Sequence, residues 1–257
     1  MTEPIEPDLR TVLRRLKLSR MLDTLPERLL LARQNKTPHQ DFLLLVLSDE
    51  AQRRDSLAIT LRAQKARLEP NSRLENWDPT AQVHFDQALL SELASLRFIE
   101  SHHHIAVVGH VGVGKTFLAH ALGHLACRRG YSVLALRADR MLKSLKHARL
   151  TQTFEQEFRK FLAPSLLIID DFGLDVMDAH ESRDAYEIFL ERHHSGSMIL
   201  TSNRGPDEWL ATFSDPVRAQ SAIDRFTSNC YDLVIEGESY RSRLKPTLHA
   251  PAELLPS

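Results

Sequence analysis

The stretch Gly109-His110-Val111-Gly112-Val113-Gly114-Lys115-Thr116 decides how the rest of the sequence is interpreted. It fits the pattern G-x-x-x-x-G-K-[ST] at every fixed position. An apolar run precedes it and a helical stretch follows it, which is the context of a phosphate-binding loop. Glycines let the backbone wrap closely around phosphates, and the N-terminus of the following helix adds partial positive charge. The alternative interpretation is a glycine-rich turn without a ligand.

We therefore expect this loop to bind ATP. Lys115 is predicted to reach the β- and γ-phosphates, and the hydroxyl of Thr116 to ligate Mg²⁺. The residues expected to contact the nucleotide are Gly109, His110, Val111, Gly112, Val113, Gly114, Lys115, Thr116 and Phe117.

Polar side chains follow two other apolar runs. Asp170 and Asp171 come directly after Leu166–Ile169, and Asn203 closes the run from Met198 to Ser202. Beside a phosphate-binding loop, Asp170 is expected to hold Mg²⁺ and Asp171 to polarise the attacking water. Asn203 is expected to orient that water and to sense the γ-phosphate. The alternatives are an ordinary strand-end turn for the two acids and a turn asparagine for Asn203.

The apolar runs predict the fold class. Each is continuous rather than alternating, which is typical of strands buried on both faces of a parallel sheet. Helical stretches at 116–129 and 183–194 alternate with them, so we predict a three-layer α/β core with a parallel sheet. The runs expected to form strands are 105–108, 133–136, 166–169, 198–201 and 232–235.

The sequence before the core is expected to form a small all-helical domain at 1–70. Thr37-Pro38-His39-Gln40 is a capping box with Pro at the first helical position, so a helix should begin there and extend to about Arg67. The ATPase core is expected at 71–243 and an irregular, proline-containing tail at 244–257. The chain then leaves no room for a C-terminal helical lid domain.

Composition narrows the class of protein. The formal net charge is −1 over 257 residues, and 42% of residues are hydrophobic, as in ordinary globular proteins. No apolar run approaches the length of a membrane span. Two cysteines are too few for a disulfide framework. We expect a cytoplasmic protein without a membrane partner.

Together these motifs resemble the AAA+ superfamily, and later stretches resemble the IstB-type helper ATPases of insertion-sequence transposition. The resemblance covers about residues 35–243. It is carried by Asp41-Phe42-Leu43, Leu96-Arg97-Phe98-Ile99-Glu100, Ile199-Leu200-Thr201-Ser202-Asn203-Arg204, Asp215-Pro216-Val217, Ala222-Ile223-Asp224-Arg225-Phe226 and Gly237-Glu238-Ser239-Tyr240-Arg241. The DnaC-type helicase loaders share the Asp-Arg and Ser-Tyr-Arg pieces.

This resemblance implies roles that spacing alone does not. Arg225 resembles the arginine finger that completes a neighbouring subunit's site, and Arg241 the sensor arginine that contacts nucleotide in the same chain. Asp171 stands where most AAA+ proteins have Glu. The implied function is an ATP hydrolase that forms a homo-oligomer driven by ATP, binds double-stranded DNA and assists a transposase. A replicative helicase loader is the alternative.

The sequence contains three further groups of residues: a basic segment, two aromatic residues before the loop and two runs of histidines. The segment 128–160 holds nine Lys/Arg and three Asp/Glu, and either contacts DNA phosphates or forms a solvated basic face. Trp77 and Phe85 either pack on adenine or belong to the core. The histidines at 102–104 and 193–194 lack metal-site spacing and are expected to be solvated.

Overall fold

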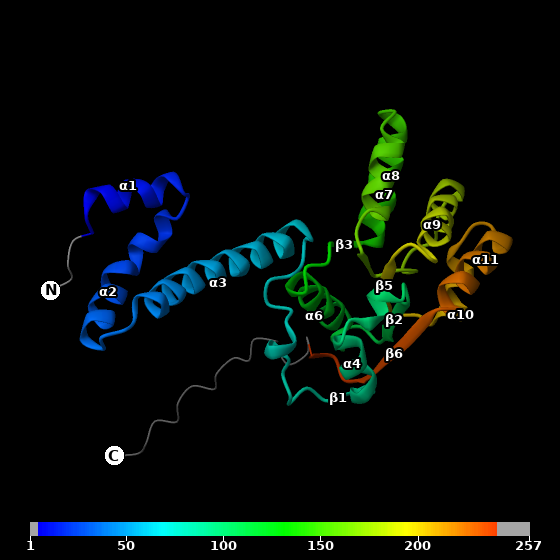
Figure 1. Ribbon diagram of the computed structural model, residues 1–257. Coiled ribbons are helices and arrows are strands. Elements are labelled where there is room, and N and C mark those ends of the chain that lie inside the picture. Colours follow the sequence, from blue (N-terminus) through cyan, green and yellow to red (C-terminus); the bar gives the residue numbers. More distant parts are fainter. Residues whose placement is uncertain (1–4, 241–257) are drawn as a thin grey trace, which may run out of the picture. The chain divides into compact units, whose positions relative to one another are not determined.

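The computed structural model describes residues 5–240 and divides the chain into two compact units, 1–61 and 62–257. We call them the N-terminal unit and the core unit (Figure 1). Helix α3 (His39–Lys65) runs from the first into the second and begins at the predicted capping box. None of the helices in the described part of the chain is long and apolar enough to cross a membrane.

The N-terminal unit consists of helices around a small core. They are α1 (Pro7–Arg15), the 3₁₀ helix η1 (Ser19–Asp23), α2 (Leu25–Gln34) and most of α3. Proline opens α1 and sits near the start of α2, where its missing N–H costs nothing. The side chains buried in its core are Ile5, Leu13, Met21, Leu25 and Val46.

The core unit contains a six-stranded sheet. Its strands are β1 (Val83–His84), β2 (His104–Gly109), β3 (Val133–Arg137), β4 (Leu166–Asp170), β5 (Ser197–Ser202) and β6 (Cys230–Gly237). Their order is β1-β6-β2-β5-β4-β3, and all neighbours from β6 to β3 are parallel. All five predicted strands are therefore confirmed.

The expectation of a purely parallel sheet is wrong at one edge. Strand β1 pairs with β6 in the antiparallel direction, Val83 opposite Gly237 and His84 opposite Glu236. An edge strand of two residues buries little apolar surface, so it needs no continuous apolar run. Hydrophobic patterning therefore does not reveal it.

Helices cover both faces of the sheet, which confirms the three layers. The helices and turns of the core unit are η2 (Leu74–Asn76), α4 (Gln87–Ala94), α5 (Arg97–Glu100), α6 (Lys115–Arg128), α7 (Ala138–Leu150), α8 (Phe154–Leu162), α9 (Ala179–Arg192), α10 (Pro206–Trp209), η3 (Leu210–Thr212) and α11 (Pro216–Thr227). Leu167 and Ile169 of β4 pack with α7, α8, α9 and α11, whereas Leu166 and Ile168 pack with α6 on the other face. This is why the first four positions of β4, 166–169, are all apolar.

One prediction about the histidines is wrong. His104 is fully buried, its Nδ1 accepts a hydrogen bond from the Met198 N–H at 3.2 Å, and its ring stacks on Phe226. Burial lowers the pKa of His104 to about 3, with the nearby charges of Arg192 and His193 acting in the same direction. His104 is therefore a neutral core residue.

This burial predicts an acid-sensitive fold. His104 titrates near 6.5 in an unfolded chain but near 3 when folded, so between these values the unfolded state binds the extra proton. The free energy of unfolding should fall as the pH drops from 6.5 to 3, by up to about 1.4 kcal/mol per pH unit. Urea unfolding of wild type and His104→Asn from pH 4 to 7 checks this. The amide keeps an acceptor without titrating, so its curve should be flatter, and two parallel curves would contradict the assignment.

Candidate active site at the carboxyl edge of the sheet

The loop between β2 and α6 depends on two glycines. Gly112 and Gly114 have φ of +86° and +100°, in the left-handed region that side chains disfavour. A Cβ at Gly112 would lie 2.1 Å from Ser239 Oγ, and one at Gly114 would lie 2.9 Å from the Trp77 ring. Both positions must therefore be glycine, and α6 begins immediately afterwards at Lys115.

A cavity of about 860 Å³ opens beside this loop, within the size range of small-molecule sites. Its walls come from the loop, from the carboxyl ends of three strands, and from the segment before β1. The lining residues used below are Trp77, Gly114, Lys115, Thr116, Phe117, Arg137, Asp170, Asp171, Asn203 and Tyr240. The parallel sheet brings these strand ends to one edge.

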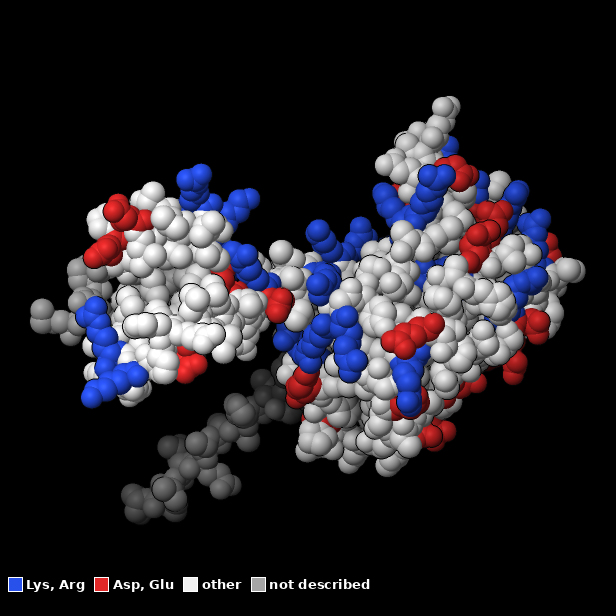
Figure 2. All heavy atoms as spheres, in the orientation of Figure 1, with Lys and Arg blue, Asp and Glu red and all other residues white. Residues whose placement is uncertain are grey.

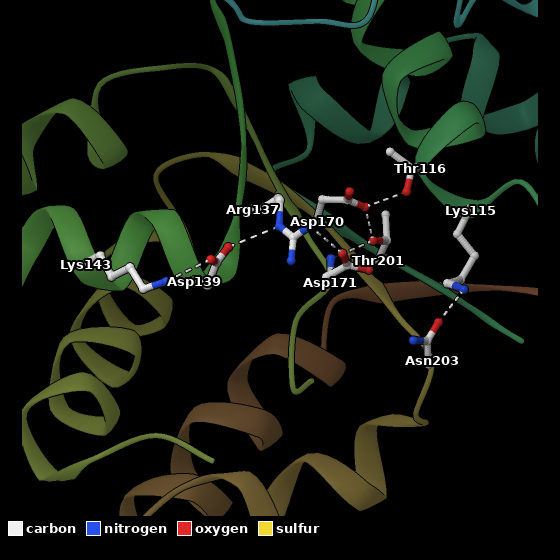
Figure 3. A network of polar contacts seen from close by, with 9 residues as sticks. All are labelled: Lys115, Thr116, Arg137, Asp139, Lys143, Asp170, Asp171, Thr201 and Asn203. Carbon is white, nitrogen blue, oxygen red and sulfur yellow. Dashed lines mark hydrogen bonds and ion pairs between the residues drawn. The ribbon is translucent and has the colours of Figure 1, made fainter. Parts of the chain in front are cut away.

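The structure brings Lys115 and Asn203 together. The Lys115 ammonium donates to Asn203 Oδ1 at 2.6 Å (Figure 3) and to the backbone carbonyl of His110 at 2.7 Å. The lysine is thus held between the loop and the end of β5. An ammonium held there can neutralise phosphate oxygens, and the amide lies within reach of the same group.

Thr116 and Asp170 also meet. The Thr116 hydroxyl donates to Asp170 Oδ1 at 2.8 Å, and the Thr201 hydroxyl donates to the same carboxylate oxygen (Figure 3). Hydroxyl and carboxylate oxygens are hard donors, and Mg²⁺ in phosphate sites takes one or two carboxylates, waters and the phosphates themselves. Thr116 and Asp170 therefore fit a Mg²⁺ site. Among the described residues no group of three or more His, Cys, Asp or Glu forms a metal cage.

Asp171 occupies a constrained position. Its φ is +56°, and its N–H donates to Thr201 Oγ1 at 3.0 Å. Arg137 Nη1 lies 3.7 Å from Asp171 Oδ2, while Arg137 Nε donates to Asp139 at 3.1 Å (Figure 3). The hydrogen bond and charge of Asp139, followed by the charge of Asp171, raise the pKa of Arg137.

Thr201 and Arg137 are the site residues that sequence reasoning missed. Thr201 lies inside an apolar run, and Arg137 was counted only within the basic segment. The available signal was their position, since each stands at or near the end of a strand that neighbours β4.

Trp77 lines the cavity and packs edge-on against Phe117, with ring centroids 5.4 Å apart. Phe85 packs on the other side of Trp77, at 5.6 Å, and belongs to the apolar cluster rather than to the lining. Tyr240 closes another side, since its N–H donates to the carbonyl of Gly112 at 2.9 Å. The segments before β1 and after β6 thus both border the loop.

Comparison with known proteins agrees with this geometry. The model of the family described as IstB-like ATP binding protein matches residues 11–247. The chain belongs to the IstB-like family. It is 39% identical over 242 residues to a putative ATP-binding protein in an insertion sequence of Mycobacterium tuberculosis, covering 94% of this chain and 96% of that one. It is 32% identical over 238 residues to the insertion sequence IS21 putative ATP-binding protein of Pseudomonas aeruginosa, covering 93% and 90%.

Solved structures show the same fold. The crystal structure of the DnaC helicase loader aligns with a TM-score of 0.54 and 19% identity, covering 65% of this chain and 97% of that one. The family model therefore confirms the predicted family, and this IstB-like chain is an ATP-binding protein whose core shares the fold of the DnaC helicase loader.

Arg225 lies apart from the cavity of its own IstB-like core. It is on α11, where its guanidinium donates to the carbonyl of Ser221 at 2.9 Å, and it is not among the cavity-lining residues. The next residue, Phe226, stacks on His104 at the first position of β2, whereas the phosphate-binding loop follows the last position. Arg225 is therefore near the end of the sheet where the parallel strands begin, opposite the end that carries the cavity. Arg241 and the predicted tail at 244–257 lie outside the described residues.

The basic segment is less uniform than its composition indicates. Lys143 pairs with Asp139 at 3.2 Å and Lys146 with Asp178 at 3.0 Å, and Arg149 pairs with Asp184. By contrast, no ion pair within residues 5–240 holds Arg140 or Arg159. The cations of this segment therefore differ in their capacity to contact a further anion.

The contacts of Lys115 predict the effect of removing it. Lys115→Ala should weaken ATP binding by about 10- to 100-fold, since hydrogen bonds to charged groups contribute about 1.5–3 kcal/mol. Calorimetric titration with ATP and Mg²⁺ measures this. Lys146→Ala removes the same charge outside the cavity and should bind normally, and equal affinities of the two variants would refute the assignment.

Proposed function

We propose that this protein hydrolyses ATP with Mg²⁺, assembles into a homo-oligomer on double-stranded DNA and assists a transposase in insertion-sequence transposition. The observation that carries the hydrolytic part is the meeting of Lys115, Thr116, Asp170, Asp171 and Asn203 at one cavity. The transposition part is supported by family membership and by relatives that are described as insertion-sequence proteins. Likeness to the helicase loader concerns the fold alone.

In this proposal each group has one task. Lys115 binds the β- and γ-phosphates and Asn203 orients the attacking water. Thr116 and Asp170 would hold Mg²⁺, which would neutralise phosphate charge. Asp171 accepts a hydrogen bond from the water that attacks the γ-phosphorus, and the β–γ bond breaks to give ADP and inorganic phosphate.

Asp171→Asn tests the hydrolytic part. The amide keeps the shape of the side chain but cannot accept a proton, so turnover should fall by about 10²–10⁴-fold while ATP still binds. Phosphate release and nucleotide affinity are measured on the same sample. Asp175→Asn, on the exposed part of the same loop, is the matched control and should hydrolyse ATP normally. Normal turnover by Asp171→Asn would remove this carboxylate from the mechanism.

Arg225 tests whether the site is shared between subunits. Since it lies away from its own cavity, we propose that it reaches the γ-phosphate bound by a neighbouring copy. Arginine fingers contribute about 10³–10⁵ in turnover, so Arg225→Ala should be nearly inactive while binding ATP. Arg183→Ala, which removes an exposed α9 arginine paired with Glu187, should stay active.

Mixing inactive variants gives the sharper result. In mixtures of Arg225→Ala with Asp171→Asn, some interfaces pair an intact Asp171 with an intact Arg225, so ATPase activity should partly return. Co-assembly is verified by pull-down of differently tagged chains. Activity that stays near zero at all mixing ratios of co-assembled chains would refute the shared site.

A further inference from the structure

A second cleft lies beside the edge strand β3, outside the nucleotide cavity. Its volume is about 500 Å³, and three basic side chains from three separate elements line it. Arg67 comes from the turn after α3, Arg140 from α7 and Lys160 from α8. Nothing in the hydrolytic site uses these residues.

The backbone fixes the turn that carries Arg67. The Leu68 N–H donates to the carbonyl of Ala63 at 3.2 Å, which closes the end of α3, and Arg67 takes the left-handed position of that closure with φ +61°. The Ala135 N–H then donates to the carbonyl of Ala66 at 2.8 Å. This bond attaches the turn to the outer edge of β3, so Arg67 is held at the cleft.

Positive charge in the cleft is only partly balanced. Glu157 is the one acid among the described lining residues, and it pairs with Lys160. No acid within residues 5–240 forms an ion pair with Arg67 or Arg140. The neighbouring Lys143, in contrast, is already paired with Asp139. Figure 2 shows Lys and Arg side chains around the recess beside the α7–α8 pair.

The floor of the cleft is apolar. The apolar lining residues are Val133, Leu134, Leu136, Phe161, Ala163 and Pro164, and Ser132 and Ser144 add hydroxyl groups to the lining. Cations beside an apolar surface match the two parts of a sugar–phosphate strand, because phosphates bind the cations while the carbon atoms of the sugars pack on apolar groups. An acidic peptide is the competing occupant, but a DNA-binding role for this protein favours the nucleic acid.

We propose that the cleft lined by Arg67, Arg140 and Lys160 holds one sugar–phosphate strand of DNA. This inference rests on the proposed DNA-binding function and locates its contact on the protein. The sequence indicated the whole segment 128–160 as a candidate DNA contact. The cleft narrows this candidate to two residues of the segment, Arg140 and Lys160, together with Arg67, which lies 61 positions before the segment begins.

The test uses the full chain with Mg²⁺ and a non-hydrolysable ATP analogue. Fluorescence anisotropy follows binding to a 30-base-pair duplex and to one of its single strands over a salt series. Arg67→Gln and Arg140→Gln should each flatten the log–log salt dependence by about 0.9 on the duplex or 0.7 on the single strand. At 0.1 M salt a slope change of 0.9 corresponds to about eightfold weaker binding.

Two further variants test the direction of the charge effect on DNA affinity and whether that effect belongs to the cleft. Glu157→Gln should bind DNA more tightly, because it releases Lys160 from its ion pair. Lys143→Gln removes one charge from α7 outside the cleft and should bind as wild type does. ATP-analogue binding by every variant shows that each is folded.

The outcomes separate the cleft from the wider function. Wild type that fails to bind either DNA overturns both this proposal and the DNA-binding function. Wild type that binds DNA, with Arg67→Gln and Arg140→Gln binding equally well, overturns the cleft alone. An equal loss in Lys143→Gln overturns it too, since the effect would then be general electrostatics. Binding of a polyglutamate peptide that depends on Arg67 and Arg140, with DNA binding unchanged, identifies the acidic peptide instead and overturns the proposal.

Discussion

The parallel pairing of β2 with β5 and of β5 with β4 is the constraint on which the site depends. Register places Val108 beside Ser202 and Ile169 beside Leu200, so that the three strands end together. Parallel strands have their carboxyl ends at one edge of the sheet. Lys115 after the loop that follows β2, Asp170 at the end of β4 and Asn203 after β5 therefore converge, although 88 positions separate the lysine from the asparagine. A shift in this register would separate the polar groups without removing any of them.

Hydrogen bonds across the strand ends turn this alignment into a fixed arrangement. Thr201 of β5 donates to Asp170 of β4 and accepts from the N–H of Asp171. The hydroxyl of Thr201 thereby orients two groups, the carboxylate of Asp170 and the backbone of Asp171. Arg137, at the end of β3, adds a positive charge on the other side of Asp171. Four strands therefore contribute to a site whose motif occupies only the loop after one of them.

Ion pairing determines which cations remain for an external partner. Aspartates of α7 and of the region around α9 pair with Lys143, Lys146 and Arg149, so part of their positive charge is balanced within the core unit. Arg192 is a related case, because its buried guanidinium donates to the carbonyls of Phe161 and Ser197 and ties the end of α8 to β5. Charge counts along the chain do not distinguish these roles, since the partners are 30 or more positions apart in most cases.

The sequence by itself determined the fold class, the five parallel strands, the long helix from His39 and the family, because each rests on local patterning or on contiguous motifs. It also indicated Lys115 and Thr116 from the loop motif and Asp170 and Asn203 from their strand-end positions, and the structure brings these four side chains together at one cavity. Only the tertiary structure decided the antiparallel β1, the burial of His104 and the positions of Thr201, Arg137 and Arg67. Each of these depends on contacts between segments distant in the chain, and no periodicity or spacing within one segment records which distant segment will pack against it.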